Sequence, residues 1–81
     1  MNEEPLTVSI RDLGVAAALV TCGFEVEETN RDTNGRMYFI FQETAALDET
    51  VNGYYADTLH VQARKFADNT KMLKGRIYAD E

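Results

Sequence analysis

Hydrophobic and polar residues alternate along three short segments, and this alternation predicts three β-strands. Residues 5–10 and 24–32 alternate apolar with polar side chains, whereas residues 36–42 are apolar at nearly every position. Between the last two segments stands Asn34-Gly35, a pair that tolerates the positive φ of a type I′ turn. The sequence therefore predicts an antiparallel hairpin preceded by one further strand.

Helical spacing of apolar residues predicts three helices. The first covers residues 12–22, with Ser9 and Asp12 as an N-cap signature and Gly23 as its stop. Its apolar residues occupy most of the circumference, so we expect a central helix that is covered on more than one side.

The other two helices follow the hairpin. Thr44 is predicted to cap a helix over residues 45–55, and the last helix is predicted over residues 62–78. We expect one face of the last helix to be buried; its residues are Ala63, Phe66, Thr70, Leu73 and Ile77. The order strand, helix, hairpin, helix, helix predicts a single α+β domain over residues 1–81, with a small antiparallel sheet on which the helices pack.

The strand over residues 36–42 raises a question, because it is apolar on both faces. Met37, Phe39 and Phe41 are predicted to face the central helix. Tyr38 and Ile40 then lie on the far face, where we expect Glu25 and Glu27 of the neighbouring strand beside them. Two readings stay open: this face is a protein contact patch, or a helix covers it.

Charge is unevenly distributed along the chain. The net charge is −6, but residues 1–60 carry three basic and eleven acidic side chains, whereas residues 61–81 carry five basic and three acidic ones. The acidic balance disfavours general affinity for nucleic acid. A second hypothesis nevertheless places nucleic acid on the last helix, through Arg64, Lys71 and Lys74, with Asp68 among them.

The acidic side chains of the hairpin suggest a further possibility. A row of carboxylates could imitate nucleic acid and occupy the basic groove of a host enzyme; its members would be Glu25, Glu27, Glu28 and Asp32. The simpler reading is a solvated strand face whose charges prevent aggregation.

Residue types that carry catalysis or bind metals are scarce. His60 and Cys22 are the only histidine and cysteine, and they stand on different predicted elements without ligand spacing. No glycine-rich phosphate loop is present, and we expect no cofactor, no metal and no enzymatic activity. The lone cysteine excludes an internal disulfide, and neither a signal peptide nor a membrane span is recognisable. We therefore expect a cytoplasmic protein.

Several segments of the chain match one family pattern: RDLGVAAAL with Gly23, RMYFIF, Tyr54-Tyr55 and FADNTKMLKGRIY. In these the chain resembles a domain-of-unknown-function family of short phage and bacterial proteins, number five-six-five-nine. The resemblance implies a phage, prophage or bacterial accessory protein, and it brings no activity or catalytic residue. Together with the patch at Tyr38 and Ile40, it leads us to expect an interaction protein that contacts itself or a host protein.

Overall fold

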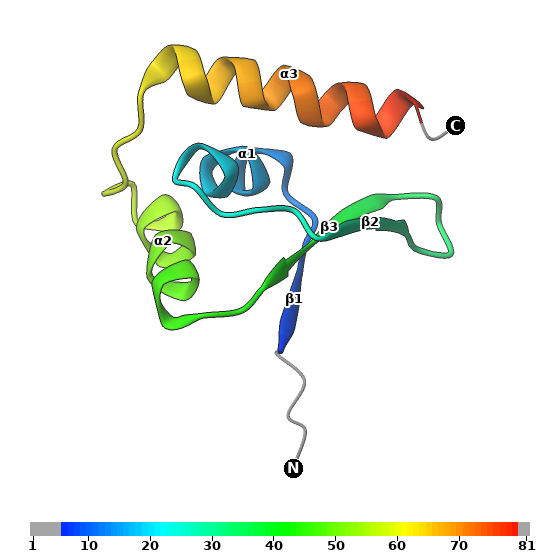
Figure 1. Cartoon of the computed structure of the whole chain (residues 1–81), viewed down its shortest axis with the longest axis horizontal. Helices are drawn as coiled ribbons and strands as arrows, with labels where there is room; N and C mark the ends of the chain where they lie inside the picture. Colours follow the sequence, from blue (N-terminus) through cyan, green and yellow to red (C-terminus); the bar gives the residue numbers. More distant parts are fainter. Residues whose placement is uncertain (1–5, 80–81) are drawn as a thin grey trace.

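The computed structural model describes residues 6–79, which form a small sheet and helices that pack against one of its faces (Figure 1). The α+β class predicted from the sequence is confirmed. Pro5, where the first strand was expected to begin, lies outside the described residues. The elements in chain order are β1 (Thr7–Ile10), α1 (Leu13–Thr21), β2 (Glu28–Arg31), β3 (Met37–Gln42), α2 (Ala45–Tyr55) and α3 (Ala63–Ala79).

The sheet has the strand order β1-β3-β2, and both pairings are antiparallel. Val8 lies opposite Phe41, and Thr29 lies opposite Phe39. β2 is shorter than the predicted strand over residues 24–32. The reason lies in the preceding helix, because the Phe24 N–H still donates to the Leu19 carbonyl at 3.0 Å and the chain has not yet turned into the sheet.

The two ends of α1 explain where the helix begins and ends. Asp12 is the N-cap, and its Oδ1 accepts the Val15 N–H at 3.1 Å. The expected Ser9 cap is wrong, because Ser9 belongs to β1 and the capping residue must directly precede the helix. At the other end Gly23 has φ +100°, and its N–H donates to the Val20 carbonyl at 3.0 Å, which terminates the helix as predicted.

α1 is the centre of the core. Five consecutive residues, Val15–Leu19, are buried, so this part of the helix is covered on all sides, and the prediction that it is covered on more than one side is confirmed. The sheet contributes Met37, Phe39 and Phe41 to the same cluster, and α2 and α3 contribute Leu47 and Leu73. Burying each large apolar side chain stabilises the fold by about 1.5–3 kcal/mol.

The hairpin turn lies where Asn34-Gly35 predicts it, but the expected type I′ geometry is wrong. A type I′ turn needs positive φ at both Asn34 and Gly35. Gly35 has φ +81°, but Asn34 does not have positive φ, since Asp57 is the one non-glycine residue of the described chain that does. The Gly35 N–H donates to the Asp32 carbonyl at 3.0 Å, and the Asp32 N–H donates to the Arg36 carbonyl at 2.9 Å. These bonds define a three-residue loop in which Gly35 occupies the left-handed position.

α2 and α3 follow the sequence pattern with one exception. Thr44 caps α2 by accepting the Leu47 N–H at its Oγ1, at 3.1 Å. On α3, Leu73 is fully buried, whereas Ala63 is exposed, so the buried face begins one turn later than expected. Asn69 joins α3 to α1 through a 2.9 Å hydrogen bond to the Thr21 hydroxyl.

Candidate protein contact site

The sheet has one face that no described helix covers, and we call it the open face. Alternation along the strands directs the core side chains to the helices, and every other side chain points the opposite way. Tyr38 and Ile40 are the large apolar side chains of the open face. Both are only half-buried, and neither belongs to the core cluster. The remaining members are Thr7 and Ser9 from β1, Glu28 and Asn30 from β2, and Gln42 from β3.

Polar side chains flank the two apolar groups on both sides. Ile40 lies between Ser9 of β1 and Glu28 of β2, and Tyr38 lies opposite Asn30. Directly opposed side chains on one face are near enough to interact. The open face is therefore a pair of apolar side chains with a polar border.

Arg11 holds the Tyr38 ring in place. Its guanidinium lies 5.1 Å from the ring centroid, a distance at which a cation is attracted to an aromatic face. The same guanidinium donates a hydrogen bond to Asp32 Oδ2 at 2.5 Å, within an ion pair. Tyr38 is thus stacked under a cation that a carboxylate fixes in position.

Asp32 connects this ion pair to the hairpin turn. Its other oxygen, Oδ1, accepts the N–H groups of Asn34 at 2.9 Å and Arg36 at 3.0 Å. The hydrogen bond from Arg11, followed by that from the Arg36 N–H, holds the pKa of the Asp32 carboxyl below its usual value. An ionised Asp32 therefore organises both the turn and the stacked arginine.

Glu25 and Glu27 precede β2, and neither lies in the cross-strand position opposite Tyr38 or Ile40, so this part of the sequence prediction is wrong. The chain leaves α1 at Gly23 and joins β3 only near residue 27, where the Glu27 N–H donates to the Ile40 carbonyl at 2.8 Å. Glu28, one position later, takes the place on the open face that was expected for the two other glutamates.

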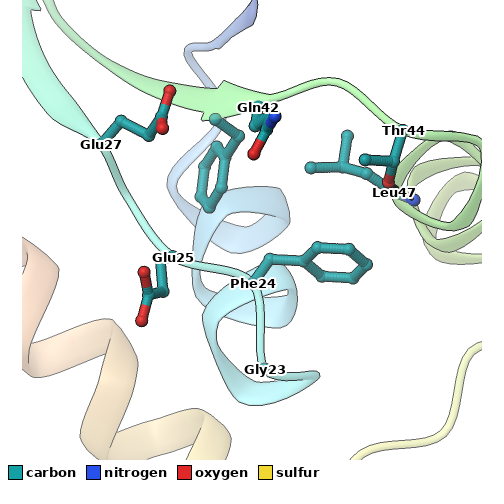
Figure 2. Close-up of a pocket in the computed structure, with 8 residues that line it drawn as sticks. Gly23, Phe24, Glu25, Glu27, Gln42, Thr44 and Leu47 are labelled. Carbon is teal, nitrogen blue, oxygen red and sulfur yellow. Dashed lines mark hydrogen bonds between the residues drawn. The ribbon is translucent and has the colours of Figure 1, made fainter. Parts of the chain in front are cut away.

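The two glutamates instead line a hollow of about 280 Å³ between the α1–β2 connection, β3 and the start of α2. Figure 2 shows them on one side of it, with Leu47 of α2 and the capping residue Thr44 on the other and Phe24 between. Its apolar surface and acidic rim suit a positively charged side chain with an apolar stem.

The expected acidic row along the hairpin is not formed. Glu25 and Glu27 lie at the hollow and Glu28 lies on the open face. The charge of Asp32 is balanced by its ion pair with Arg11. A row of free carboxylates was the basis of the nucleic-acid mimic hypothesis. The structure separates its members, so that hypothesis loses its geometric support.

The basic residues predicted for nucleic-acid contact all lie exposed on α3. Arg64, Lys71 and Lys74 face away from α1, with Asp68 among them as the sequence indicates. Arg64 and Lys71 are seven residues apart and so lie on one line along the helix, about 10 Å from each other. This surface lies apart from the open face, on a different element.

The residues with metal-binding or nucleophilic chemistry are separated. Cys22 is exposed at the end of α1, and His60 is exposed in the connection between α2 and α3. Within residues 6–79, no three His, Cys, Asp or Glu side chains are placed to hold a metal ion together. None of the helices in this range is long and apolar enough to cross a bilayer.

Sequence reasoning missed the Arg11–Asp32 pair. Asp32 at the first position of a turn is a recognisable signal, because its side chain bonds to nearby backbone N–H groups. Arg11 gave no such signal, since it lies 21 residues away and meets Asp32 only when β1 and β2 flank β3.

The fold and the open face define a small α+β domain with a three-stranded sheet whose helices, within residues 6–79, cover one side only. The profile of the family described as Domain of unknown function (DUF5659) matches residues 7–79, and the chain belongs to this family, as its sequence resemblance indicated. No curated protein and no solved structure matches the chain.

Proposed function

We propose that this protein is a non-enzymatic interaction domain that binds a partner protein, either a second copy or a host protein, through the open face of its sheet. The observation that carries the proposal is the position of Tyr38 and Ile40. Both are partly exposed on a sheet face that no described helix covers, although the opposite, helix-covered face already provides the core.

The composition of the open face supports this proposal. Protein interfaces have buried aromatic and aliphatic anchors at their centre and polar side chains at the rim. Tyr38 and Ile40 match the anchors, and Ser9, Glu28 and Asn30 match the rim. The Arg11 guanidinium pre-orders the tyrosine, which lowers the entropy lost when a partner binds.

The proposal includes a place of action and a biological setting. A single cysteine suits the reducing cytoplasm, where disulfides do not persist. The phage or mobile-element origin implied by the resemblance is a further part of the proposal. Proteomic localisation in a native host tests both.

The double change Tyr38→Ser with Ile40→Thr tests the open face. Both replacements suit an exposed strand, so we expect the melting temperature to change little while partner capture or self-association is lost. The matched control is Tyr78→Ser with Met72→Thr, which removes a similar pair of exposed side chains from α3, where they are 65% and 43% exposed.

The measurements are thermal unfolding, light scattering over a range of concentrations, and capture of partners from the native host on the immobilised chain. If the double change leaves both association and capture unchanged, the open face is not a contact site. A large drop in melting temperature would instead mean that Tyr38 and Ile40 are part of the stabilising core.

A second candidate function is nucleic-acid binding through α3. The observation that favours it is that Arg64, Lys71 and Lys74 are exposed and take part in no ion pair among residues 6–79. Mobility shifts with single- and double-stranded DNA and RNA at several salt concentrations test it. Salt-dependent binding that the change Lys71→Glu with Lys74→Glu abolishes would support it, and absence of binding at low salt would refute it.

A further inference from the structure

β1 is an outer strand of the sheet, and no described strand pairs with its outer edge. The hydrogen bonds to β3 show which backbone N–H and C=O groups of β1 point toward that edge. The Leu6 carbonyl accepts the Glu43 N–H at 2.8 Å, so Leu6 points its backbone groups toward β3. The direction of the backbone N–H and C=O groups alternates along an antiparallel strand. Those of Val8 and Ile10 therefore also point toward β3, whereas those of Thr7 and Ser9 point away from the sheet. No described hydrogen bond uses the outward N–H and C=O groups of these two residues.

Among residues 6–79, the edge of β1 lacks the features that protect sheet edges from pairing. Such edges usually carry charged side chains, bulges or a covering segment. β2, the other edge, has Glu28 and Arg31, and Arg31 reaches α3 by donating to the Ile77 carbonyl at 2.6 Å. Residues 6–10 carry no charge at all. In a protein of net charge −6, this neutral edge is a place where two copies can meet without repulsion.

Leu6 gives a second reason to expect a strand beside β1. Its side chain is 74% exposed, although it continues the apolar row of Val8 and Ile10 on the core face. Val8 and Ile10 are themselves only partly buried. The row of Leu6, Val8 and Ile10 therefore lies at the edge of the sheet, and part of its apolar surface is still exposed to water.

We propose that two copies of this protein pair β1 with β1 in antiparallel register, so that their sheets join into one of six strands. Leu6 then lies opposite Ile10 of the second copy, and the two Val8 residues meet on the two-fold axis. Thr7 and Ser9 of each copy bond with Ser9 and Thr7 of the other, which makes four backbone hydrogen bonds. This register continues the apolar row across the axis and satisfies the outward backbone groups.

The proposed pairing uses the β1 edge and is independent of binding through the open face, but it would extend the proposed function. An axis that relates two antiparallel strands stands perpendicular to the sheet, so both open faces lie on the same side of the dimer. Tyr38 and Ile40 of the two copies would then lie on one broad surface that no described helix covers, separated by the two β1 strands. The dimer would present a doubled contact surface to a further partner.

The change Ser9→Pro tests the pairing. It removes an outward N–H and leaves the bonds to β3 in place, because proline is tolerated at such edge positions. The wild-type chain is expected to sediment and scatter with twice its 9.1 kDa mass, and Ser9→Pro to raise the dissociation constant about tenfold or more. Thr29→Pro, at an outward position on β2, is the control and should leave the dimer unchanged.

Cross-linking provides a second measurement that does not depend on the proline variant. In a Cys22→Ser background, Val8→Cys should form a disulfide-linked dimer on oxidation, because facing residues on the axis lie within disulfide range. Ile10→Cys should not, since it faces Leu6 of the second copy. Equal cross-linking at both positions, or a wild-type chain that stays monomeric at millimolar concentration, would overturn the pairing.

The two proposals fail in different ways. If Tyr38→Ser with Ile40→Thr abolishes association while Ser9→Pro leaves it intact, the open face is the contact site and the β1 pairing is wrong. If Ser9→Pro alone dissociates the dimer and the double change alters nothing, the pairing stands and the open face has no role in binding.

Discussion

The contact between Gly14 and Tyr54 provides the most specific test of how α1 and α2 pack. Gly14 is the second residue of α1, and a Cβ added there would overlap the Tyr54 hydroxyl from α2. It would also lie 3.2 Å from Asp12 Oδ1 and 3.3 Å from the Tyr54 ring carbon Cζ. The glycine is therefore required by this contact, not by its backbone conformation.

The effect of Gly14→Ala is a balance of two opposing terms. Alanine is favoured over glycine inside a helix by about 0.8–1 kcal/mol. Overpacking against a buried neighbour costs about 1–3 kcal/mol. Because the overlap is with the hydroxyl at the end of a partly buried tyrosine, we expect a net loss of stability of up to about 2 kcal/mol.

Removing the hydroxyl should reverse this outcome. The Tyr54 hydroxyl donates no hydrogen bond to another residue of the described chain, so Tyr54→Phe alone should change stability by less than about 1 kcal/mol. In that background the added methyl group loses the overlap with the hydroxyl and keeps the contacts with the ring carbon and with Asp12 Oδ1, so Gly14→Ala should be close to neutral. The coupling between the two changes is expected to be about 1–3 kcal/mol.

The assay is equilibrium unfolding in urea of the wild type, both single variants and the double variant. The curves are fitted with one common slope of unfolding free energy against urea concentration. Gly75→Ala is the matched control, because nothing lies within 4 Å of a Cβ added there on α3. It should stabilise the chain by about 0.5–1 kcal/mol. A Gly14→Ala effect that equals this control, or that is the same with tyrosine and phenylalanine, would refute the packing of α2 on α1.

Three further predictions concern the hairpin, α3 and the Arg11–Asp32 pair. Gly35→Val forces a β-branched residue to φ +81° and should cost about 1–3 kcal/mol; an unchanged melting temperature would contradict the turn geometry. Leu73→Ala should cost about 2–5 kcal/mol, whereas Lys71→Ala on the exposed face should stay within about 0.5 kcal/mol; chemical unfolding that ranks them the other way would mean that α3 is rotated. Because the pKa of Asp32 is lowered in the folded state, its contribution is present above its ordinary pKa of 3.8 and is lost as the pH falls below it. Melting temperatures measured on acidification should therefore fall more steeply for the wild type than for Asp32→Asn, and parallel curves would show that the ion pair contributes nothing.

The sequence alone determined the order of the elements and most of the buried side chains. Periodicity over a few residues identified α1 as a helix covered on more than one side, and Thr44 and Gly23 marked helix ends through bonds to near neighbours. The alternation in β3 separated its buried from its half-exposed side chains. These features are decided by atoms within one or two turns or by the period of a strand, so a linear pattern contains them.

Only the tertiary structure decided what borders Tyr38 and Ile40. The neighbours of β3 depend on strand order and register, and the chain between α1 and β2 still follows the helix end where the sequence suggested a strand. Glu28 therefore replaced Glu25 and Glu27 at the open face, and Arg11 met Asp32 across 21 residues. Such contacts result from the joint packing of all the elements, and no local spacing in the sequence records them.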